Sequence, residues 1–419
     1  MQSCDMGLDF RQRAALFLHR QVWQRLPKRA RRSAIEAAAD LLAPRSEVDP
    51  QAGGAVAVAG VLRASSGLGH SARLCEKALR ATGQRTAAID LTHVMMANSG
   101  DRPEELAESV PEGPGSIIVH VNSPLLPLAL LSIGKRRLKG KLIVGYWAWE
   151  LPETPPSWRR GIPYVHEIWV PSRFVARAVA PLAGDAPVLV VPHPVMVDRP
   201  DGPLVQAPPP SERFDVLTAF DMSSGFSRKN PLASIAAFKR AFGHDTGARL
   251  VVKIIRGETY RSGLEQIRAA IRGHGNIVLD ERARSHQDFM HMLGEADVFI
   301  SLHRSEGFGL ILAEAMAAGT CVIATDWSGN TDFLHADNSM PVGYRLVGAE
   351  DPQGEYAYPH MQWAEPDVDA AAAALVRLRD DPARRQRLVA RALHDAERGF
   401  GVEAYRGALD QRSRLRLAP

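Results

Sequence analysis

Short apolar runs alternate with helix-like segments through the first half of the chain. The runs are AVAVAGV at 55–61, SIIVHV at 116–121, KLIVGYW at 141–147, EIWVP at 167–171 and PVLVVP at 187–192. Nearly continuous apolar runs of this length are typical of parallel strands that are buried on both faces. Helical spacing between them, for example at 70–81 and 172–180, predicts strand–helix–strand units and a doubly wound α/β sheet.

A second series of the same kind follows a proline-rich stretch. Its runs are FDVLTAF at 214–220, RLVVKII at 249–255, NIVLD at 276–280, DVFISL at 297–302 and TCVIAT at 320–325. Helices are expected between them, most clearly at 231–242, 310–318 and 368–378. The prolines between 192 and 210 are incompatible with a helix or a central strand, so this stretch predicts a linker.

The pattern therefore predicts two Rossmann-like, doubly wound α/β domains that face each other across a cleft. The expected organisation is a basic, amphipathic helical segment (1–48), an N-terminal domain (49–198), a linker (199–212), a C-terminal domain (213–398) and a C-terminal helix (399–419) that packs back on the N-terminal domain. In open α/β sheets, ligands bind beyond the carboxyl ends of the strands, so the cleft is the expected site.

Composition narrows the class of protein. The 419 residues are 45% hydrophobic and 23% charged, which excludes general disorder. A net charge of +4 is too small for the whole chain to bind nucleic acid. The three cysteines have neither disulfide nor zinc-site spacing, so a cytoplasmic location is expected. The sequence has no apolar run long enough for a transmembrane helix.

Residues 11–32 carry eight cations and no acid, with Leu16, Phe17, Trp23 and Leu26 between them. This pattern fits an amphipathic helix on the anionic inner face of the cytoplasmic membrane. It equally fits a solvated helix that packs on the first domain through its apolar residues, and the sequence leaves both open.

Residues 301–332 are the most informative stretch for chemistry. A predicted strand end leads into Glu306, Gly307, Phe308 and Gly309, and the following helix carries Glu314. Free N–H groups at a helix start favour phosphate, whereas two carboxylates nearby favour hydroxyl donors. A nucleotide-sugar has a charged centre and two hydroxyl-bearing ends, so it satisfies both features.

Here the sequence resembles retaining GT-B enzymes of the glycosyltransferase family 4 type. Their hallmark is Glu, seven residues and Glu, with Gly-Phe-Gly after the first acid, and Glu306 and Glu314 fit it. Ala-Met-Ala at 315–317 and Val-Ile-Ala-Thr at 322–325 follow in the family's order. Ser328 departs from the usual Gly-Gly pair, and Asp332 replaces the usual Glu.

The resemblance implies a role for each residue of this stretch. Glu306 would hold the donor sugar near its anomeric carbon, and Glu314 would hold the ribose. The turn at Gly307 and the N–H groups of Phe308, Gly309 and Leu310 would meet sugar and phosphate oxygens. Arg228 and Lys229 would neutralise the diphosphate, although the family usually spaces its two cations further apart and Ser223 stands where Arg is common. Glu306, Arg228 and Lys229 are the expected catalytic residues.

Other candidates lie at further strand ends. Lys253 interrupts an apolar strand and is expected either at the donor or at the sheet rim. Gly67 and Gly69 form a glycine-rich turn that the resemblance places near the diphosphate. Asn122 holds the position of a donor-sugar histidine in the family, and His120 is either a substitute for it or a core residue.

Three weaker signals complete the prediction. Tyr146, Trp147, Trp149 and Glu150 form an aromatic patch that is expected on the acceptor side. His303 and Arg304 flank the same crevice as Glu306, and Arg304 could simply pair with that acid. Asp367 and Asp369 imitate a metal-binding Asp-x-Asp, but they open a helix and are better explained as a helix cap. No metal or cofactor is expected beyond the UDP- or GDP-linked sugar as co-substrate.

The resulting hypothesis is a retaining, metal-independent hexosyltransferase. It would move a mannose- or glucose-type sugar from a nucleotide diphosphate to a hydroxyl of a glycan or lipid-linked acceptor, in bacterial surface polysaccharide or lipopolysaccharide synthesis. A nucleotide-sugar epimerase or phosphorylase on the same fold is one alternative. A non-catalytic sugar-binding protein is another, and the intact set of acids and cations argues against it.

Overall fold

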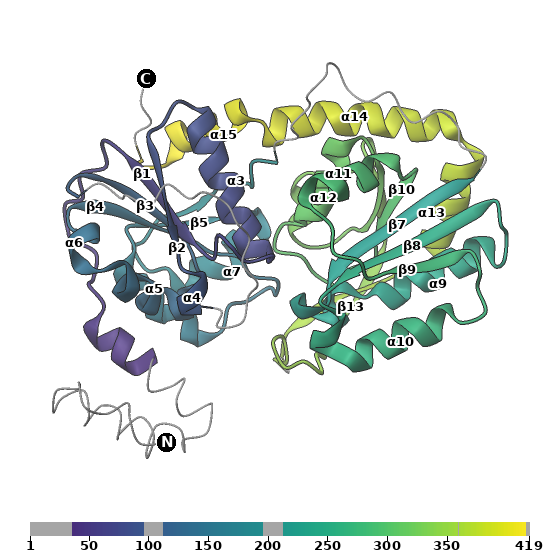
Figure 1. Cartoon of the computed structure of the whole chain (residues 1–419), viewed down its shortest axis with the longest axis horizontal. Coiled ribbons are helices and arrows are strands. Elements are labelled where there is room, and N and C mark those ends of the chain that lie inside the picture. Colours follow the sequence, from purple (N-terminus) through teal and green to yellow (C-terminus); the bar gives the residue numbers. More distant parts are fainter. Residues whose placement is uncertain (1–35, 96–111, 196–212, 359, 416–419) are drawn as a thin grey trace, which may run out of the picture.

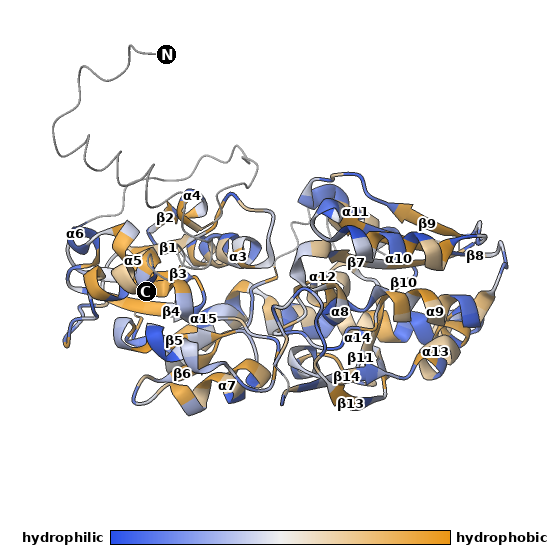
Figure 2. Ribbon diagram, turned by 90° about the horizontal axis from the view of Figure 1, so that it is seen from below, coloured by the Kyte–Doolittle hydropathy of each residue, from blue (hydrophilic) through white to orange (hydrophobic). Residues whose placement is uncertain are grey.

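The computed structural model describes residues 36–95, 112–195, 213–358 and 360–415. The predicted linker at 199–212 and the basic stretch at 11–32 lie outside these ranges. Within them, two lobes lie side by side (Figure 1). Hydrophobic residues concentrate on strands such as β4 and β6, whereas outer helices such as α10 and α13 have mixed faces (Figure 2). Among the described helices, none is both long and apolar enough to cross a bilayer.

The first domain is a six-stranded parallel sheet covered by helices. Its strands are β1 (Val56–Gly60), β2 (Thr86–Asp90), β3 (Gly115–His120), β4 (Lys141–Tyr146), β5 (Glu167–Val170) and β6 (Val188–Val190). Its main helices are α3 (Gly67–Ala81), α4 (Thr92–Met95), α5 (Leu126–Ile133), α6 (Lys135–Leu138) and α7 (Arg173–Val179). The strand order is β2-β1-β3-β4-β5-β6, so the winding direction reverses between β1 and β3.

The second domain has the same plan. Its strands are β7 (Phe214–Asp221), β8 (Ala248–Ile255), β9 (Ile277–Asp280), β10 (Val298–Ser301), β11 (Cys321–Thr325) and β12 (Met340–Val342). Its helices are α8 (Phe226–Lys229), α9 (Pro231–Phe242), α10 (Arg261–Ile271), α11 (His286–Glu295), α12 (Leu310–Ala318), α13 (Val368–Asp380) and α14 (Pro382–Phe400). The order β12-β11-β10-β7-β8-β9 reverses between β7 and β10. The predicted fold of two Rossmann-like, doubly wound domains is confirmed.

A small hairpin of the second domain packs into the hydrophobic core of the first domain. It consists of β13 (Tyr344–Gly348) and β14 (Gln362–Pro366), which pair antiparallel. Tyr356 and Trp363, in and beside this hairpin, are buried in the same apolar cluster as Trp149 and Trp158 of the first domain. Burial of aromatic area at this seam holds the lobes together.

The chain ends by returning to the first domain. Helix α14 runs along one side of the molecule, and α15 (Val402–Arg412) packs against α3 (Figure 1). The carboxylate of Glu167 in β5 accepts hydrogen bonds from Ser413 Oγ and the N–H of Arg414, both at 2.6 Å. The predicted boundary at residue 398 falls inside α14, because this helix continues to Phe400 before the crossover.

The first turn of α3 presses on the loop that precedes it, and Gly69 makes this approach possible. A Cβ atom at Gly69 would lie 2.5 Å from the carbonyl oxygen of Val61 and 2.6 Å from that of Ala64. A Cβ at Gly67, in the same turn, would meet nothing within 4 Å. The two predicted ligand-binding glycines therefore differ: Gly69 serves packing, and Gly67 faces open space.

This difference predicts the effect of two matched substitutions. Gly69→Ala should lower the free energy of unfolding by about 2 kcal/mol or more, because backbone atoms must shift to accept the methyl group. Gly67→Ala should leave stability unchanged or raise it by about 0.5 kcal/mol, because alanine restricts the unfolded chain. Urea denaturation of both variants checks this, and equal stability of the two would contradict the packing role of Gly69.

Candidate active site

The two strands at the winding reversal of the second domain supply the charged residues of the site. Strand β7 leads through a short turn into α8, which ends with Arg228 and Lys229. Its neighbour β10 leads into the loop that carries Glu306. Because parallel strands end at the same edge of a sheet, these residues meet at the switch point between β7 and β10.

Glu306 is buried between the two cations, with 8% of the residue exposed. Lys229 Nζ donates a hydrogen bond to Oε1, and Arg228 Nη1 lies 3.1 Å from Oε2. Burial alone would raise the pKa of Glu306, but the nearby Lys229 and Arg228 outweigh it and lower the pKa to about 2. The carboxyl group is therefore an anion at neutral pH and not a proton donor.

Arg228 is held in place by more than Glu306. Its Nη1 donates to the carbonyl oxygen of Ser305 at 2.9 Å, and its Nη2 donates to that of Ser224 at 2.6 Å. The guanidinium carbon lies 5.4 Å from the ring centroid of Tyr356. Burial lowers the pKa of Lys229, and its attraction to Glu306 opposes this change. Arg228 is therefore held in one position by several contacts, whereas Lys229 is held mainly by its ion pair with Glu306.

The turn after Glu306 brings the start of α12 to the same place. Gly309 precedes the helix with a φ of 90°, in the left-handed region that suits glycine, and its lack of a side chain leaves the first N–H groups of α12 uncapped. Gly307 packs closely on the backbone of Trp149, where an added Cβ would lie 2.9 Å from the carbonyl oxygen. Ser172 Oγ donates to the Gly307 carbonyl at 2.5 Å.

Phe308 has a different role from its neighbours. Its ring is buried against His193, Phe333 and Phe400, with ring centroids 4.9 to 5.7 Å apart. The side chain therefore anchors the turn in the core, and only the backbone of Phe308 is available to a ligand.

A small pocket lies among these groups. It is lined by Thr218, Ala219, Phe220, Lys229, Phe299, Ser301, Glu306, Gly309, Leu310, Ile311 and Leu312. The structure thus brings together four predicted residues, Lys229, Glu306, Gly309 and Leu310. The sequence does not single out Thr218 on β7, because nothing in an apolar strand run indicates which residue lines a pocket. The volume is about 20 Å³, roughly the space of one water, so a larger ligand requires the groups to separate.

Glu314 lies further along α12 and faces the first domain. It is 4% exposed, and its Oε1 lies 2.7 Å from His70 Nε2 of α3. Other contacts also cross between the lobes: Arg256 Nη2 donates to the carbonyl oxygen of Ser65 at 2.9 Å, and Tyr356 donates its hydroxyl to Glu150 at 3.0 Å. The second-domain acid predicted to hold the ribose therefore has a first-domain partner.

The loop after β11 carries Ser328 and Asp332, the two residues that depart from the family pattern, and both have structural contacts. Ser328 has a φ of 78°, and its Oγ accepts a hydrogen bond from the N–H of Glu306 at 2.8 Å. Ser328 therefore orients the backbone of the buried acid. Asp332 accepts a hydrogen bond from the N–H of Arg173 at 2.7 Å and so holds the start of α7 in the other domain.

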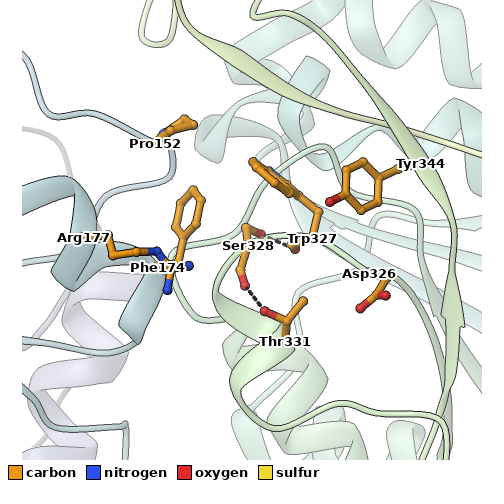
Figure 3. Close-up of a pocket in the computed structure, with 8 residues that line it drawn as sticks. All are labelled: Pro152, Phe174, Arg177, Asp326, Trp327, Ser328, Thr331 and Tyr344. Carbon is orange, nitrogen blue, oxygen red and sulfur yellow. Dashed lines mark hydrogen bonds between the residues drawn. The ribbon is translucent and has the colours of Figure 1, made fainter.

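A larger pocket lies between α7 and this loop (Figure 3). Its volume is about 310 Å³, and its lining residues are Pro152, Phe174, Arg177, Asp326, Trp327, Ser328, Thr331 and Tyr344. Phe174 and Arg177 approach from the first domain, and Trp327 and Tyr344 lie opposite them (Figure 3). This pocket could not be predicted from the sequence, because its walls come from segments far apart in the chain.

Lys253 does not join the group around Glu306 in this structure. Its Nζ donates to the carbonyl oxygens of Arg282 at 2.5 Å and Ile254 at 3.1 Å, and it lies 3.9 Å from Asp280. These are the contacts of a buried lysine at the sheet rim, the second of the two interpretations. Its contact with a donor stays a prediction.

The structure corrects the prediction that the aromatic patch contacts the acceptor. Tyr146 and Trp147 are 1% and 0% exposed, so neither ring has a surface for an acceptor. Trp149 packs on Tyr356 of the second domain, and Glu150 accepts the Tyr356 hydroxyl. Tyr146 and Trp147 are therefore buried inside the first domain, against His120 and Trp158, and only Trp149 and Glu150 lie at the seam between the domains.

Asn122 and His120 take structural positions at the end of β3. Asn122 Oδ1 accepts the N–H of Ala148 at 2.9 Å and ties two strand ends together. His120 is buried against the ring of Tyr146, and its Nδ1 lies 2.9 Å from Ser71 Oγ. Burial lowers the pKa of His120 well below its ordinary value, which favours the interpretation as a neutral core histidine.

The structure also places three other residues that the sequence singled out, His303, Arg304 and Asp367. His303 is buried, with Nε2 3.0 Å from Asn330 Oδ1. Arg304 pairs with Glu365 at 2.7 Å, so the alternative in which it pairs with Glu306 is wrong. Asp367 accepts the N–H groups of Asp369 and Ala370, which confirms that it caps α13.

Residues 173–400, more than half of the chain, match the family described as family 4 glycosyltransferase in conflict systems. No curated protein sequence matches the chain. The fold is similar to Staphylococcus aureus TarM, solved with fondaparinux, α-GlcNAc-glycerol and UDP, with a TM-score of 0.51 and 11% identity. That match covers 70% of this chain and 54% of TarM, so this chain spans about half the length of that enzyme.

Two other solved structures match over nearly their whole length. Anabaena HepE, in complex with UDP and glucose, has a TM-score of 0.56 and 12% identity, covering 86% of this chain and 99% of HepE. A glycosyltransferase from Rickettsia africae has a TM-score of 0.57 and 13% identity, covering 85% of this chain and 97% of that one. These likenesses support the GT-B type of two-domain fold.

The buried ion cluster predicts how Glu306 contributes to stability. Glu306→Gln should lower the free energy of unfolding by about 3 kcal/mol at pH 7, because two buried cations lose their anion. The folded pKa of about 2 lies below the ordinary 4.5, so this contribution is complete above pH 4.5 and disappears as the pH falls toward 2. The difference between variant and wild type should therefore shrink by about pH 3.

Guanidinium denaturation at both pH values measures this difference. Glu365→Gln is the control, because Glu365 forms a partly exposed pair with Arg304 and should cost less than about 1 kcal/mol. A loss for Glu306→Gln that is equal at the two pH values would show that its charge is not what stabilises the fold.

Proposed function

The chain belongs to the family 4 glycosyltransferases of conflict systems, and we propose that it transfers a hexose from a nucleotide diphosphate sugar to a hydroxyl acceptor with retention at the anomeric carbon. One observation carries this proposal: a buried carboxylate lies between two cations beside an uncapped helix start. UDP is the favoured donor nucleotide, because the TarM and HepE structures were solved with UDP.

The geometry supports different roles for the groups that would contact the diphosphate and for the acid that would contact the sugar. The uncapped N–H groups at Leu310 and the cations Arg228 and Lys229 favour the diphosphate, which leaves with an extra negative charge. Glu306 accepts hydroxyl hydrogen bonds from the sugar and stabilises positive charge at its ring during transfer. Its low pKa excludes a role as proton donor at neutral pH.

Donor entry requires a change from the structure described here. The small pocket holds roughly one water, and Glu306 occupies both cations. The diphosphate therefore has to compete with Glu306 for Lys229, the less firmly fixed cation. Lobe opening admits the donor, and closure then excludes water and restores the catalytic geometry.

The acceptor is proposed to enter through the larger pocket beside Trp327 and Tyr344. Its aromatic rings suit the apolar face of a sugar, and Arg177 and Asp326 supply polar contacts. Ser328 connects this pocket to the backbone of Glu306. A glycan or lipid-linked acceptor, metal independence, a cytoplasmic location and membrane contact through residues 11–32 stay part of the proposal.

Activity can be measured with the full chain and a panel of UDP- and GDP-hexoses. Transfer to a hydroxyl acceptor should release the nucleotide diphosphate, and hydrolysis without acceptor should be slow. The product should keep the anomeric configuration of the donor by NMR. Conversion of the donor to an epimer without acceptor would instead support the epimerase alternative.

Glu306→Gln should reduce kcat by about 100-fold or more, because it removes an electrostatic interaction with the reacting sugar. Binding of UDP alone, measured by calorimetry, should not weaken and should become tighter, because UDP lacks the sugar that Glu306 contacts and its diphosphate no longer competes with the acid for Lys229. Glu365→Gln should retain wild-type kcat. If Glu306→Gln keeps full turnover in a correctly folded protein, the Glu306 carboxylate does not contribute to catalysis and the proposal fails.

A further inference from the structure

Three donor side chains from three helices meet where the lobes touch near the start of α3. His70 comes from α3 of the first domain, His286 from the first turn of α11, and Glu314 from α12. Among the described residues, this is the one set of three or more His, Cys, Asp or Glu side chains that could together hold a metal ion. Its donor atoms all lie within 4.8 Å of one another.

The distances suit a transition metal. Glu314 Oε1 lies 2.7 Å from His70 Nε2 and 3.8 Å from His286 Nε2, and the two imidazole centroids are 4.6 Å apart. A tetrahedral zinc ion with ligands at 2.0–2.1 Å places its ligand atoms about 3.3 Å apart. The two observed distances bracket that value, so small side-chain rotations are enough to admit the ion.

The chemistry of the donor set narrows the ion further. Two imidazoles and one carboxylate are a known ligand set for Zn²⁺, with water in the fourth position. Mg²⁺ and Ca²⁺ prefer oxygen ligands and are disfavoured by two nitrogen donors. Glu314 is buried, whereas His286 is partly exposed, so an ion can reach the site from solvent.

We propose that Zn²⁺ binds to His70, His286 and Glu314 and fastens the two lobes together in a donor-excluding state. The ion would occupy the carboxylate that is otherwise available to the ribose of the donor, and it would add a link between the domains. Zinc binding and donor binding would therefore exclude each other. The inhibitory part rests on the proposed function, whereas metal binding itself does not.

Metal binding is tested on tag-free, chelator-treated full-length protein. ZnCl₂ should raise the unfolding temperature in a concentration-dependent way, because the ion binds the folded state. MgCl₂ should have no such effect. His286→Ala and His70→Ala should each weaken Zn²⁺ binding by roughly tenfold or more, since loss of a ligand costs at least as much as loss of a supporting contact.

His291→Ala is the matched control, because His291 lies on the same helix α11 and is largely exposed. It should bind Zn²⁺ like the wild type. Equal zinc affinity of His286→Ala and His291→Ala, or no stabilisation of the wild type by zinc, would overturn the proposed site. His286 is partly exposed, so its substitution leaves the core intact.

Donor exclusion is measured by UDP binding at fixed free Zn²⁺, set with a metal buffer because the diphosphate also binds cations. Zinc should weaken UDP binding to the wild type and to His291→Ala, and should have little effect on His286→Ala. Equal weakening in all three proteins would overturn the exclusion. Zinc binding without any UDP binding to zinc-free protein would leave the metal site standing and count against the proposed function.

Discussion

The geometry of the candidate site depends on one ion cluster, in which the adjacent cations Arg228 and Lys229 both pair with the buried Glu306. Arg228 and Lys229 both point to the edge of the sheet where β7 and β10 end, and burial of either charge alone is costly. Glu306 compensates both, and carbonyl oxygens of the surrounding loops fix Arg228. The loop after β10, the turn into α12 and the loop after β11 all lie around this cluster. A change in its charge is therefore expected to change the backbone geometry of the site.

The seam between the lobes is built from the same segments. Gly307, next to Glu306, packs on Trp149, and Ser172 holds the Gly307 carbonyl from the first domain. The hairpin that carries Trp363 continues the first domain's apolar cluster, while α15 ties the chain end to Glu167. Lobe separation thus acts directly on the loop that carries the acid, which couples domain motion to the site.

The sequence predicted what depends on local pattern and missed what depends on tertiary contact. The strand runs and the helix start at Leu310 follow from periodicity, whereas a shared site for Glu306, Arg228 and Lys229 was implied by the family resemblance. The same reasoning could not tell that Phe308 points into the core, that Arg304 selects Glu365, or that Tyr146 and Trp147 are covered. A run of aromatic residues looks alike whether it lines a cleft or is buried, because its burial is decided by tertiary partners such as His193, Trp158 and Tyr356.

The charge balance of the cluster explains why the site suits a diphosphate. Without donor, Arg228, Lys229 and Glu306 sum to one positive charge, and the start of α12 adds roughly half a charge. A bound diphosphate brings roughly one negative charge per phosphate, which leaves the whole group close to neutral. Protein charges alone can therefore balance the donor under the proposed mechanism. An added divalent ion at Glu314 would instead neutralise an acid that the donor needs as a hydrogen-bond acceptor, which is why zinc there acts against the donor and not with it.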